Sequence, residues 1–424
     1  MTILRSLLVS GCLVGGTGGV PCGRAAESAR PTLKPTLAAT VSERFDSNVM
    51  LQDRGPVQHI ESFVTSVQPV LGASLPFSGA WPGSLSLQYA PDFAFFHERD
   101  EESYLRHTGL FRLEGKSPAF RATAQVRAQY TDGSTEGPIW GTPDEPGTTP
   151  ALGASEVRYR RRNFYWQSPL EARYDRERWW ARGVFEARLW DIMTEDRIVP
   201  GSVYQNYVDR TDVVGGPELG LKLAPGFESG VGYRFGHQDQ EQHPFAEPYT
   251  YQNDFHRVVG VITASPLSQV KVGGEAGPSF HQFNPSSLPP DAKPDETLFY
   301  YSLNLTVQLA TNTVLRGQAY QHLLPSTAGR AAFQNIRATG TLEHRWRPDL
   351  RTSFRFDLQE YDMVRGLDTR DQVFTPEVRL DYTFSHRFTL GAWYAYEWAD
   401  NLDPGTSGRE YERNVVGVSL KASY

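Results

Sequence analysis

Apolar and polar residues alternate with a period of two along most of the chain. In the last segment, Val416, Val418 and Leu420 alternate with Gly417 and Ser419. Because successive side chains of a β-strand point to opposite faces, each such segment has one apolar face and one polar face. The pattern therefore predicts an all-β protein. The clearest other segments are 120–130, 301–309, 354–358, 378–384 and 388–398.

These segments are longer than soluble strands, which usually have about five or six residues. A strand that crosses a membrane needs about 9–11 residues. The polar faces carry many charges, and short connections alternate with long polar ones, which is typical of a barrel that spans an outer membrane. We therefore predict a single-chain transmembrane antiparallel β-barrel with short periplasmic turns and long extracellular loops. The long loops are expected near 132–155, 191–210, 238–250, 282–297, 325–334, 362–371 and 400–412.

About 18 strands are expected, and 16 is the alternative count. An even number brings both termini to the periplasmic side. Since lipid offers no hydrogen-bond partners, the sheet must close on itself. The expected strand starts are residues 36, 59, 84, 102, 118, 157, 178, 212, 228, 253, 269, 298, 313, 335, 350, 373, 387 and 413.

The first residues have the features of a cleaved signal peptide. Arg5 precedes an apolar run, and Gly23-Arg24-Ala25 fits the small-x-small cleavage rule. We expect residues 1–26 to be removed, 27–35 to form a periplasmic segment and 36–424 to form the barrel. Both cysteines, Cys12 and Cys22, lie in the leader, so the barrel contains no disulfide.

Composition excludes several other classes. The chain has 424 residues with 38 Gly, 29 Pro and 4 Met, which disfavours a helical protein. After the leader, no run of about eighteen apolar residues indicates a membrane helix. The net charge of −7 gives no reason to expect a nucleic-acid partner. No cofactor is implied.

Aromatic residues gather near the expected strand ends, where amphipathic rings favour the membrane interfaces. The tryptophans assigned to these interfaces are Trp166, Trp179, Trp180, Trp190 and Trp346. The alternative is ordinary β-core packing.

The final strand resembles the C-terminal assembly signal of bacterial outer-membrane proteins, which ends in an aromatic residue after alternating apolar ones. The matching residues are Val416, Gly417, Val418, Leu420, Ala422 and Tyr424. The resemblance implies insertion by the outer-membrane barrel-assembly machinery.

The first strand ends in an Asp/Asn-rich turn with Asp46 and Asn48. Together with the strand pattern, this turn resembles the β-barrel porin families of Gram-negative bacteria. The resemblance implies an outer-membrane barrel. Some similar proteins accompany exopolysaccharide export systems.

Basic residues, mostly arginine, occupy the polar faces, whereas the expected loops are acidic. A charge on the lipid side would cost about 2–4 kcal/mol near the midplane, so we expect these arginines to face inward. They form either a water-filled lumen that attracts anions or ion pairs that fill and rigidify the interior. The predicted lumen-lining residues are Arg112, Arg121, Arg127, Arg173, Arg188, Arg337, Arg355 and Arg379.

The long loop at 132–155 is the third external loop in this count. By its position we predict that it folds into the barrel and narrows it, with Glu136, Ile139 and Trp140 as the constriction residues. A flexible surface loop is the alternative.

No catalytic motif is present. The sequence lacks Gly-x-Ser-x-Gly, a phosphate-binding glycine loop and His-Glu-x-x-His. His237, Asp239, Glu241 and His243 are spaced by two and would share one face of an extended segment. A solvated acidic loop explains this run better than a divalent-metal site, so no metal is assigned.

Three functions remain. The first is a porin-like channel for small hydrophilic solutes, with anions as candidates, in contact with outer-membrane lipids and lipopolysaccharide. The second is a non-conducting barrel in an exopolysaccharide export or secretion system. The third, least favoured, is an enzyme at the barrel rim. The pattern does not set the oligomeric state.

Overall fold

The structure is a computed structural model of the chain. It describes residues 32–49, 60–79, 81–133, 161–191, 209–240, 249–325, 332–365, 370–403 and 410–424. The expected signal peptide, residues 1–26, lies outside the described residues.

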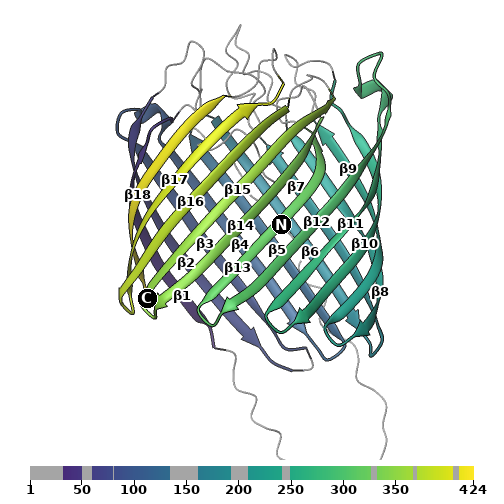
Figure 1. Cartoon of the computed structure of the whole chain (residues 1–424), viewed down its shortest axis with the longest axis horizontal. Helices are drawn as coiled ribbons and strands as arrows, with labels where there is room; N and C mark the ends of the chain where they lie inside the picture. The colour runs from purple at the N-terminus through teal and green to yellow at the C-terminus, as the bar shows by residue number, and fades with distance from the viewer. Residues whose placement is uncertain are drawn as a thin grey trace, which may run out of the picture.

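The described residues form 18 β-strands and two short 3-10 helices (Figure 1). The first nine strands are β1 (Lys34–Asp46), β2 (Ser62–Phe77), β3 (Gly83–Phe96), β4 (Tyr104–Lys116), β5 (Phe120–Gly133), β6 (Arg161–Asp175), β7 (Trp179–Asp191), β8 (Arg210–Ala224) and β9 (Phe227–Gln240). The others are β10 (Asn253–Leu267), β11 (Val270–Phe283), β12 (Asp295–Ala310), β13 (Thr313–Pro325), β14 (Ala332–Arg347), β15 (Leu350–Arg365), β16 (Arg370–Ser385), β17 (Phe388–Asn401) and β18 (Tyr411–Ser423). The helices are η1 (Asp100–Glu102) and η4 (Pro285–Ser287).

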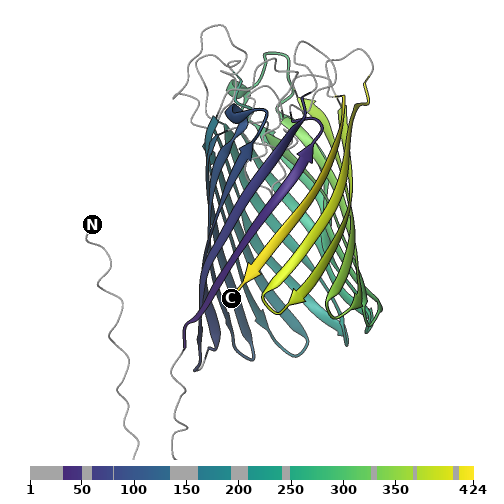
Figure 2. The same ribbon diagram turned by 90° about the vertical axis from the view of Figure 1, so that its left-hand side faces the viewer.

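Each strand pairs antiparallel with its neighbours in the sequence, and β1 pairs with β18. At this seam Val41 lies opposite Leu420, and the Tyr424 amide donates to the Leu37 carbonyl at 2.8 Å. The sheet is therefore a closed barrel, and Figure 2 shows the yellow β18 beside the purple β1. The predicted fold class is confirmed, with 18 strands in the described chain rather than 16. It is the architecture that the resemblance to β-barrel porins implies.

The alternating apolar and polar residues of each strand lie on the outer and inner faces of the barrel wall, respectively. On β12, Leu303 points outward and is 43% exposed, while its neighbour Ser302 points inward. On β9, Val231 is 65% exposed on the same outer surface. Exposed apolar side chains recur at alternate positions around the barrel, so its outside is apolar. A solvated surface of this extent would be unfavourable, whereas contact with hydrocarbon would not.

The two rims differ in their connections. At the lower rim of Figure 1, consecutive strands join through very short turns, such as Pro225-Gly226 between β8 and β9. Gly226 has φ of +73°, a conformation that favours glycine in such a turn. Two expected long loops at the upper rim are shorter than predicted, because β14 begins at Ala332 and β15 continues to Arg365. Among the described residues, neither helix has the length and apolar character needed to cross a membrane.

Candidate functional site: a charged lumen

The side chains on the inner face of the barrel enclose a space that we call the lumen. Strand register places all eight arginines singled out in the sequence on this face. Arg112, for example, lies between the outward Phe111 and Leu113, and Arg355 lies between the outward Phe354 and Phe356. The eight are Arg112, Arg121, Arg127, Arg173, Arg188, Arg337, Arg355 and Arg379.

These arginines fall into two groups. Arg112 and Arg121 lie toward the lower rim and are exposed, whereas Arg173 and Arg337 are 6% and 5% exposed. Within the described residues, no carboxylate lies within ion-pair distance of Arg121, so its charge acts on the lumen directly. Both interpretations of the charges thus describe part of the wall: some arginines face open space and others fill it.

Among the described residues, a buried ion network is centred on Glu218 of β8, whose side chain is fully buried. Arg182 of β7 donates to Glu218 Oε2 at 2.5 Å, and Arg234 of β9 pairs with the other oxygen. Arg234 also donates to Glu275 at 2.7 Å, and Tyr300 donates to Glu275 at 2.8 Å. Five strands, β7, β8, β9, β11 and β12, are tied together on their inner side. Such a network rigidifies the wall and leaves few of its charges free.

A second network lies nearer the lower rim. Arg173 donates to Asp175 at 2.8 Å and to Glu228 at 2.6 Å, and Lys222 pairs with Asp175 at 3.1 Å. Another buried pair joins Arg337 of β14 to Asp357 of β15. Arg173 and Asp175 lie on the same strand, whereas the other pairs cross strands on the inner face, where opposite charges stabilise a sheet.

Two tryptophans expected at the membrane interfaces point inward instead. Trp180 and Trp190 are buried, with the guanidinium of Arg173 4.6 Å above Trp180 and that of Arg210 3.7 Å above Trp190. The cation–π attraction between each guanidinium and its indole ring favours this inward placement of the two tryptophans. The stacked guanidinium also keeps its hydrogen-bonding edges free for other partners. Trp179 and Trp346 do lie on the outer face, 43% and 63% exposed.

The upper end of the β13–β14 hairpin lies across the lumen. β13 leaves β12 after Gln321, and the Leu323 carbonyl accepts a hydrogen bond from Gln238 of β9 at 3.1 Å. On its other side, Phe333 contacts Tyr361 of β15, with ring centroids 5.4 Å apart. A buried cluster continues this packing to β18; its members are Leu324, Phe333, Tyr361, Val373, Ala399 and Tyr411. The hairpin end therefore narrows the upper lumen.

The sequence contains a signal for this hairpin. Leu323-Leu324 and Ala332-Phe333 are adjacent apolar pairs where one face of a lipid-facing strand should be polar. An apolar run on both faces is the pattern of a buried strand. The predicted constriction residues Glu136, Ile139 and Trp140 lie outside the described residues.

Below the hairpin the lumen is open. A cavity of about 860 Å³ extends along the inner side of the wall, with Arg121, Arg182 and Lys271 among its charged lining residues. Inward residues near the lower rim, such as Arg121 and Lys421, are exposed, whereas those near the upper rim, such as Tyr361 and Arg413, are buried. The lumen is thus a funnel that narrows toward the upper rim.

The candidate metal residues do not form a cluster in the described residues. His237 and Asp239 lie on the outer face of β9, and His237 Nδ1 is 2.6 Å from Asp254 Oδ1 of β10. Glu241 and His243 lie outside the described residues. No group of three or more metal-ligating side chains occurs in the part of the chain that the structure describes.

The residues of the expected assembly signal form one outer stripe and one inner contact. Val416, Val418, Leu420 and Ala422 point outward on β18. A Cβ on the inward Gly417 would lie 2.2 Å from the Trp393 ring, so any larger residue here would require that ring to shift. Tyr424 follows the end of the strand and is 83% exposed.

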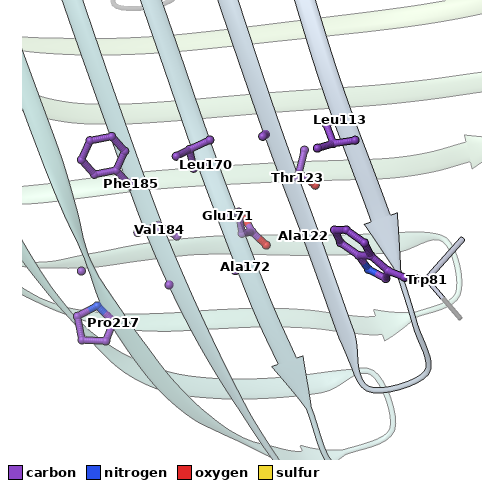
Figure 3. Close-up of a pocket in the computed structure, with 13 residues that line it drawn as sticks. Trp81, Leu113, Ala122, Thr123, Leu170, Glu171, Ala172, Val184, Phe185 and Pro217 are labelled. Carbon is purple, nitrogen blue, oxygen red and sulfur yellow. The ribbon is translucent and has the colours of Figure 1, made fainter. Parts of the chain in front are cut away.

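An apolar hollow of about 520 Å³ lies on the outer face of β4–β8, and Figure 3 shows side chains that line it. Ala122 and Ala172 form its floor beside the larger Leu170 and Phe185, with Trp81 at the lower end. Because these side chains point away from the lumen, the hollow belongs to the apolar outer surface.

One carboxylate at the upper rim lies beyond the strand ends. Glu98 follows β3 and accepts hydrogen bonds from Ser62 Oγ at 2.6 Å and the Phe63 amide at 2.8 Å. The hydrogen bond from Ser62 lowers the pKa of Glu98 below its usual value.

No protein-family model matches the chain, and no curated protein does. Among solved structures it is similar to OccAB3 of Acinetobacter baumannii, with a TM-score of 0.44 and 10% identity over 92% of this chain and 99% of that one. The outer membrane protein opdK of Pseudomonas aeruginosa gives a TM-score of 0.41 and 10% identity, over 92% and 99% of the two chains. A mutant ferric enterobactin receptor, PfeA of Pseudomonas aeruginosa, gives 0.42 and 9% identity, over 92% and 80%.

Proposed function

We propose that this chain is an outer-membrane channel for small hydrophilic solutes, with a preference for anions. The observation that carries the proposal is the pairing of an apolar outer face with a charged inner face in one closed barrel. Such a barrel is stable when lipid surrounds it and water fills it. Its partners are outer-membrane lipids and lipopolysaccharide, and the β18 stripe is the region that the assembly machinery would bind.

The preference for anions follows from the uneven neutralisation of the inner charges. Ion pairs with arginine neutralise acidic residues such as Glu218 and Glu275. Arg121, in contrast, faces the open cavity without a carboxylate partner among the described residues. A positive potential in a narrow passage raises the local concentration of anions. The short-turn rim and both termini would face the periplasm.

A second candidate function is a non-conducting barrel that serves an export or secretion system. The packed contact of Phe333 with Tyr361 in the upper lumen favours it, because a closed lumen passes no solute. We prefer the channel because the lower lumen is open and charged.

Single-channel recording of the refolded chain in a planar bilayer separates the two candidates. The channel predicts stepwise currents of uniform size. Absence of any step from correctly folded barrels would reject the channel in favour of the non-conducting barrel.

A further inference from the structure

The apolar hollow on the outer face of β4–β8 exists because the outward side chains there are small. Strand register aligns Ala122 of β5 with Ala172 of β6, and Ala172 with Gly183 of β7. The same row continues from Gly183 to Pro217 of β8. The wall is therefore thin along this row, and a cavity of about 520 Å³ remains outside it (Figure 3). Small-molecule pockets occupy about 300–1,000 Å³, so the hollow is large enough for a ligand.

The chain's own aromatic rings fill the neighbouring part of this row. Gly115 of β4 pairs with Ala122, and a Cβ at Gly115 would lie 2.4 Å from the Trp81 ring. A Cβ at Gly183, by contrast, would have no atom within 4 Å beyond its chain neighbours. Aromatic carbon thus covers the β4 end of the row, whereas no described side chain covers Gly183. An external apolar group can fill this space.

Aromatic rings also border the lower end of the hollow. On one side the ring centroids of Trp81 and Phe120 are 6.3 Å apart, and on the other side those of Tyr174 and Trp179 are 5.7 Å apart. Tyrosine and tryptophan rings favour the level of the lipid headgroups. The hollow therefore lies just above the headgroup level of the short-turn rim, at the depth of the acyl chains.

A positive charge lies at this headgroup level, below the hollow. The guanidinium of Arg176 is 5.0 Å from the centre of the Tyr174 ring, and Tyr174 is the next outward residue after Ala172 on β6. No carboxylate of the described residues lies within ion-pair distance of Arg176. The same turn holds Glu177 and Arg178, so two arginines and one glutamate give it a net charge of +1.

The separation between charge and hollow matches the dimensions of a glycerophospholipid. Arg176 follows Ala172 by four residues, which is about 13 Å along the strand at ~3.3 Å per residue. With a strand tilt of about 40°, the charge lies about 10 Å below the row of small residues along the membrane normal. The turn is held in place by Lys222, whose Nζ donates to the Arg176 carbonyl at 2.9 Å. An acyl chain that begins at a phosphate beside Arg176 would reach the hollow.

A second copy of the chain fits this surface less well than a lipid does. Two copies that meet through the same face form a symmetric contact, in which each residue approaches its own equivalent. Such a contact would bring the two Arg176 side chains toward each other, and like charges repel. An anionic headgroup would instead neutralise Arg176.

We propose that the hollow binds one glycerophospholipid of the periplasmic leaflet, with an acyl chain over Gly183 and the phosphate beside Arg176. This inference rests on the membrane placement in the proposed function, which puts the short-turn rim on the periplasmic side. It does not depend on conduction, because the hollow lies on the outer face and is separate from the lumen.

Native mass spectrometry of the refolded chain in detergent tests the site. The probe is dioleoylphosphatidylglycerol, and the comparison lipid is dioleoylglycerol, which has the same chains and lacks the phosphate. One phosphatidylglycerol should bind per chain at low lipid concentration, and more tightly than the diacylglycerol. Arg176→Gln should weaken phosphatidylglycerol binding about fivefold, the contribution of one basic residue near a membrane surface. It should leave diacylglycerol binding unchanged.

Gly183→Leu tests the acyl-chain part of the site. The leucine side chain occupies the hollow, so the binding of both lipids should weaken about tenfold. Gly260→Leu is the matched control, because Gly260 is an outward glycine of β10 where a Cβ would lie 3.9 Å from the Ala276 carbonyl oxygen.

The control for Arg176→Gln is Arg387→Gln. Arg387 is also an exposed arginine at a lower turn, with its guanidinium 5.2 Å from the centre of the Tyr424 ring. Neither control substitution should change phosphatidylglycerol binding, because neither residue borders the hollow.

Three results would overturn the site: equal binding of phosphatidylglycerol and diacylglycerol, equal effects of Gly183→Leu and Gly260→Leu, or tighter binding of lipopolysaccharide than of phosphatidylglycerol through the same two residues. A dimer that Gly183→Leu dissociates would assign the hollow to a second copy and would also overturn it. Each variant is first checked for folding by its heat-dependent migration in a denaturing gel. If Gly183→Leu does not fold, the comparison of Arg176→Gln with Arg387→Gln decides.

The lipid site and the channel can fail separately. Phosphatidylglycerol binding that depends on Arg176 and Gly183, without conductance, would reject the channel and keep the lipid site. Conductance together with equal binding of the two lipids would reject the lipid site and keep the channel.

Discussion

Arg413 of the last strand donates from Nε to Oδ1 of Asp46 on the first strand at 2.8 Å, and both side chains are buried. The two residues are 367 positions apart in sequence and meet only because the barrel closes. The Asn48 amide also donates to Asp46 at 3.1 Å. A single carboxylate thus joins the turn after β1 to the inner face of β18.

Removal of this ion pair should weaken the closure of the barrel. Arg413→Gln leaves the Asp46 charge buried without its main partner, and we expect a loss of about 3–5 kcal/mol in the free energy of unfolding. Denaturant titration of the refolded protein measures it. Arg347→Gln, which breaks an exposed pair with Asp349 at a lower turn, is the control and should change stability by less than about 0.5 kcal/mol. Equal effects of the two substitutions would contradict the role of the seam.

The inward hairpin end should control the size of the passage. Phe333 is fully buried against Tyr361, so Phe333→Ala should cost about 3–5 kcal/mol of stability. It should also raise the single-channel conductance, because it removes a side chain from the upper lumen. Phe299→Ala, on the outer face of β12 with 57% exposure, is the control and should leave conductance unchanged. An unaltered conductance in the Phe333 variant would place the constriction elsewhere.

Two substitutions near the lower rim should shift ion selectivity in opposite directions. Arg121→Gln removes an unpaired positive charge from the open lumen, and Glu114→Gln removes the negative partner of Arg112. In a salt gradient, the reversal potential should move toward zero for Arg121→Gln and toward stronger anion preference for Glu114→Gln. Both shifts should shrink at high salt because these charges are exposed. Shifts of the same sign would show that the local charges do not set selectivity.

The strands could be predicted from sequence because each one is constrained locally. Every expected strand start lies within four residues of the observed one. A strand with one lipid-facing surface must alternate, and a displacement by one residue would put charges such as Arg355 into lipid. The alternation that allowed the strands to be predicted also predicts that the arginines share one face.

The contacts between distant strands could not be predicted in the same way. Glu218 and Arg234 carry no local signal, and their roles depend on which side chains the closed barrel brings near them. The alternation of apolar and polar residues shows that Trp190 lies on one face of its strand, but it does not show that Arg210 stacks on the Trp190 ring. Composition near strand ends therefore assigned Trp180 and Trp190 to the wrong surface. The adjacent apolar residues Leu323 and Leu324 did signal a buried strand end, but alternation elsewhere in β13 concealed it.

The proposed channel requires that one face of each strand contacts lipid and that the other contacts water inside the barrel. Cysteine scanning along β12 tests it in liposomes, with a charged, membrane-impermeant thiol reagent and a parent in which Cys12 and Cys22 are replaced by serine. Ser302→Cys and Asn304→Cys should react rapidly, and Leu303→Cys and Leu305→Cys should stay unlabelled. Equal labelling at all four positions, or faster labelling at the leucine positions, would contradict this arrangement of the two faces.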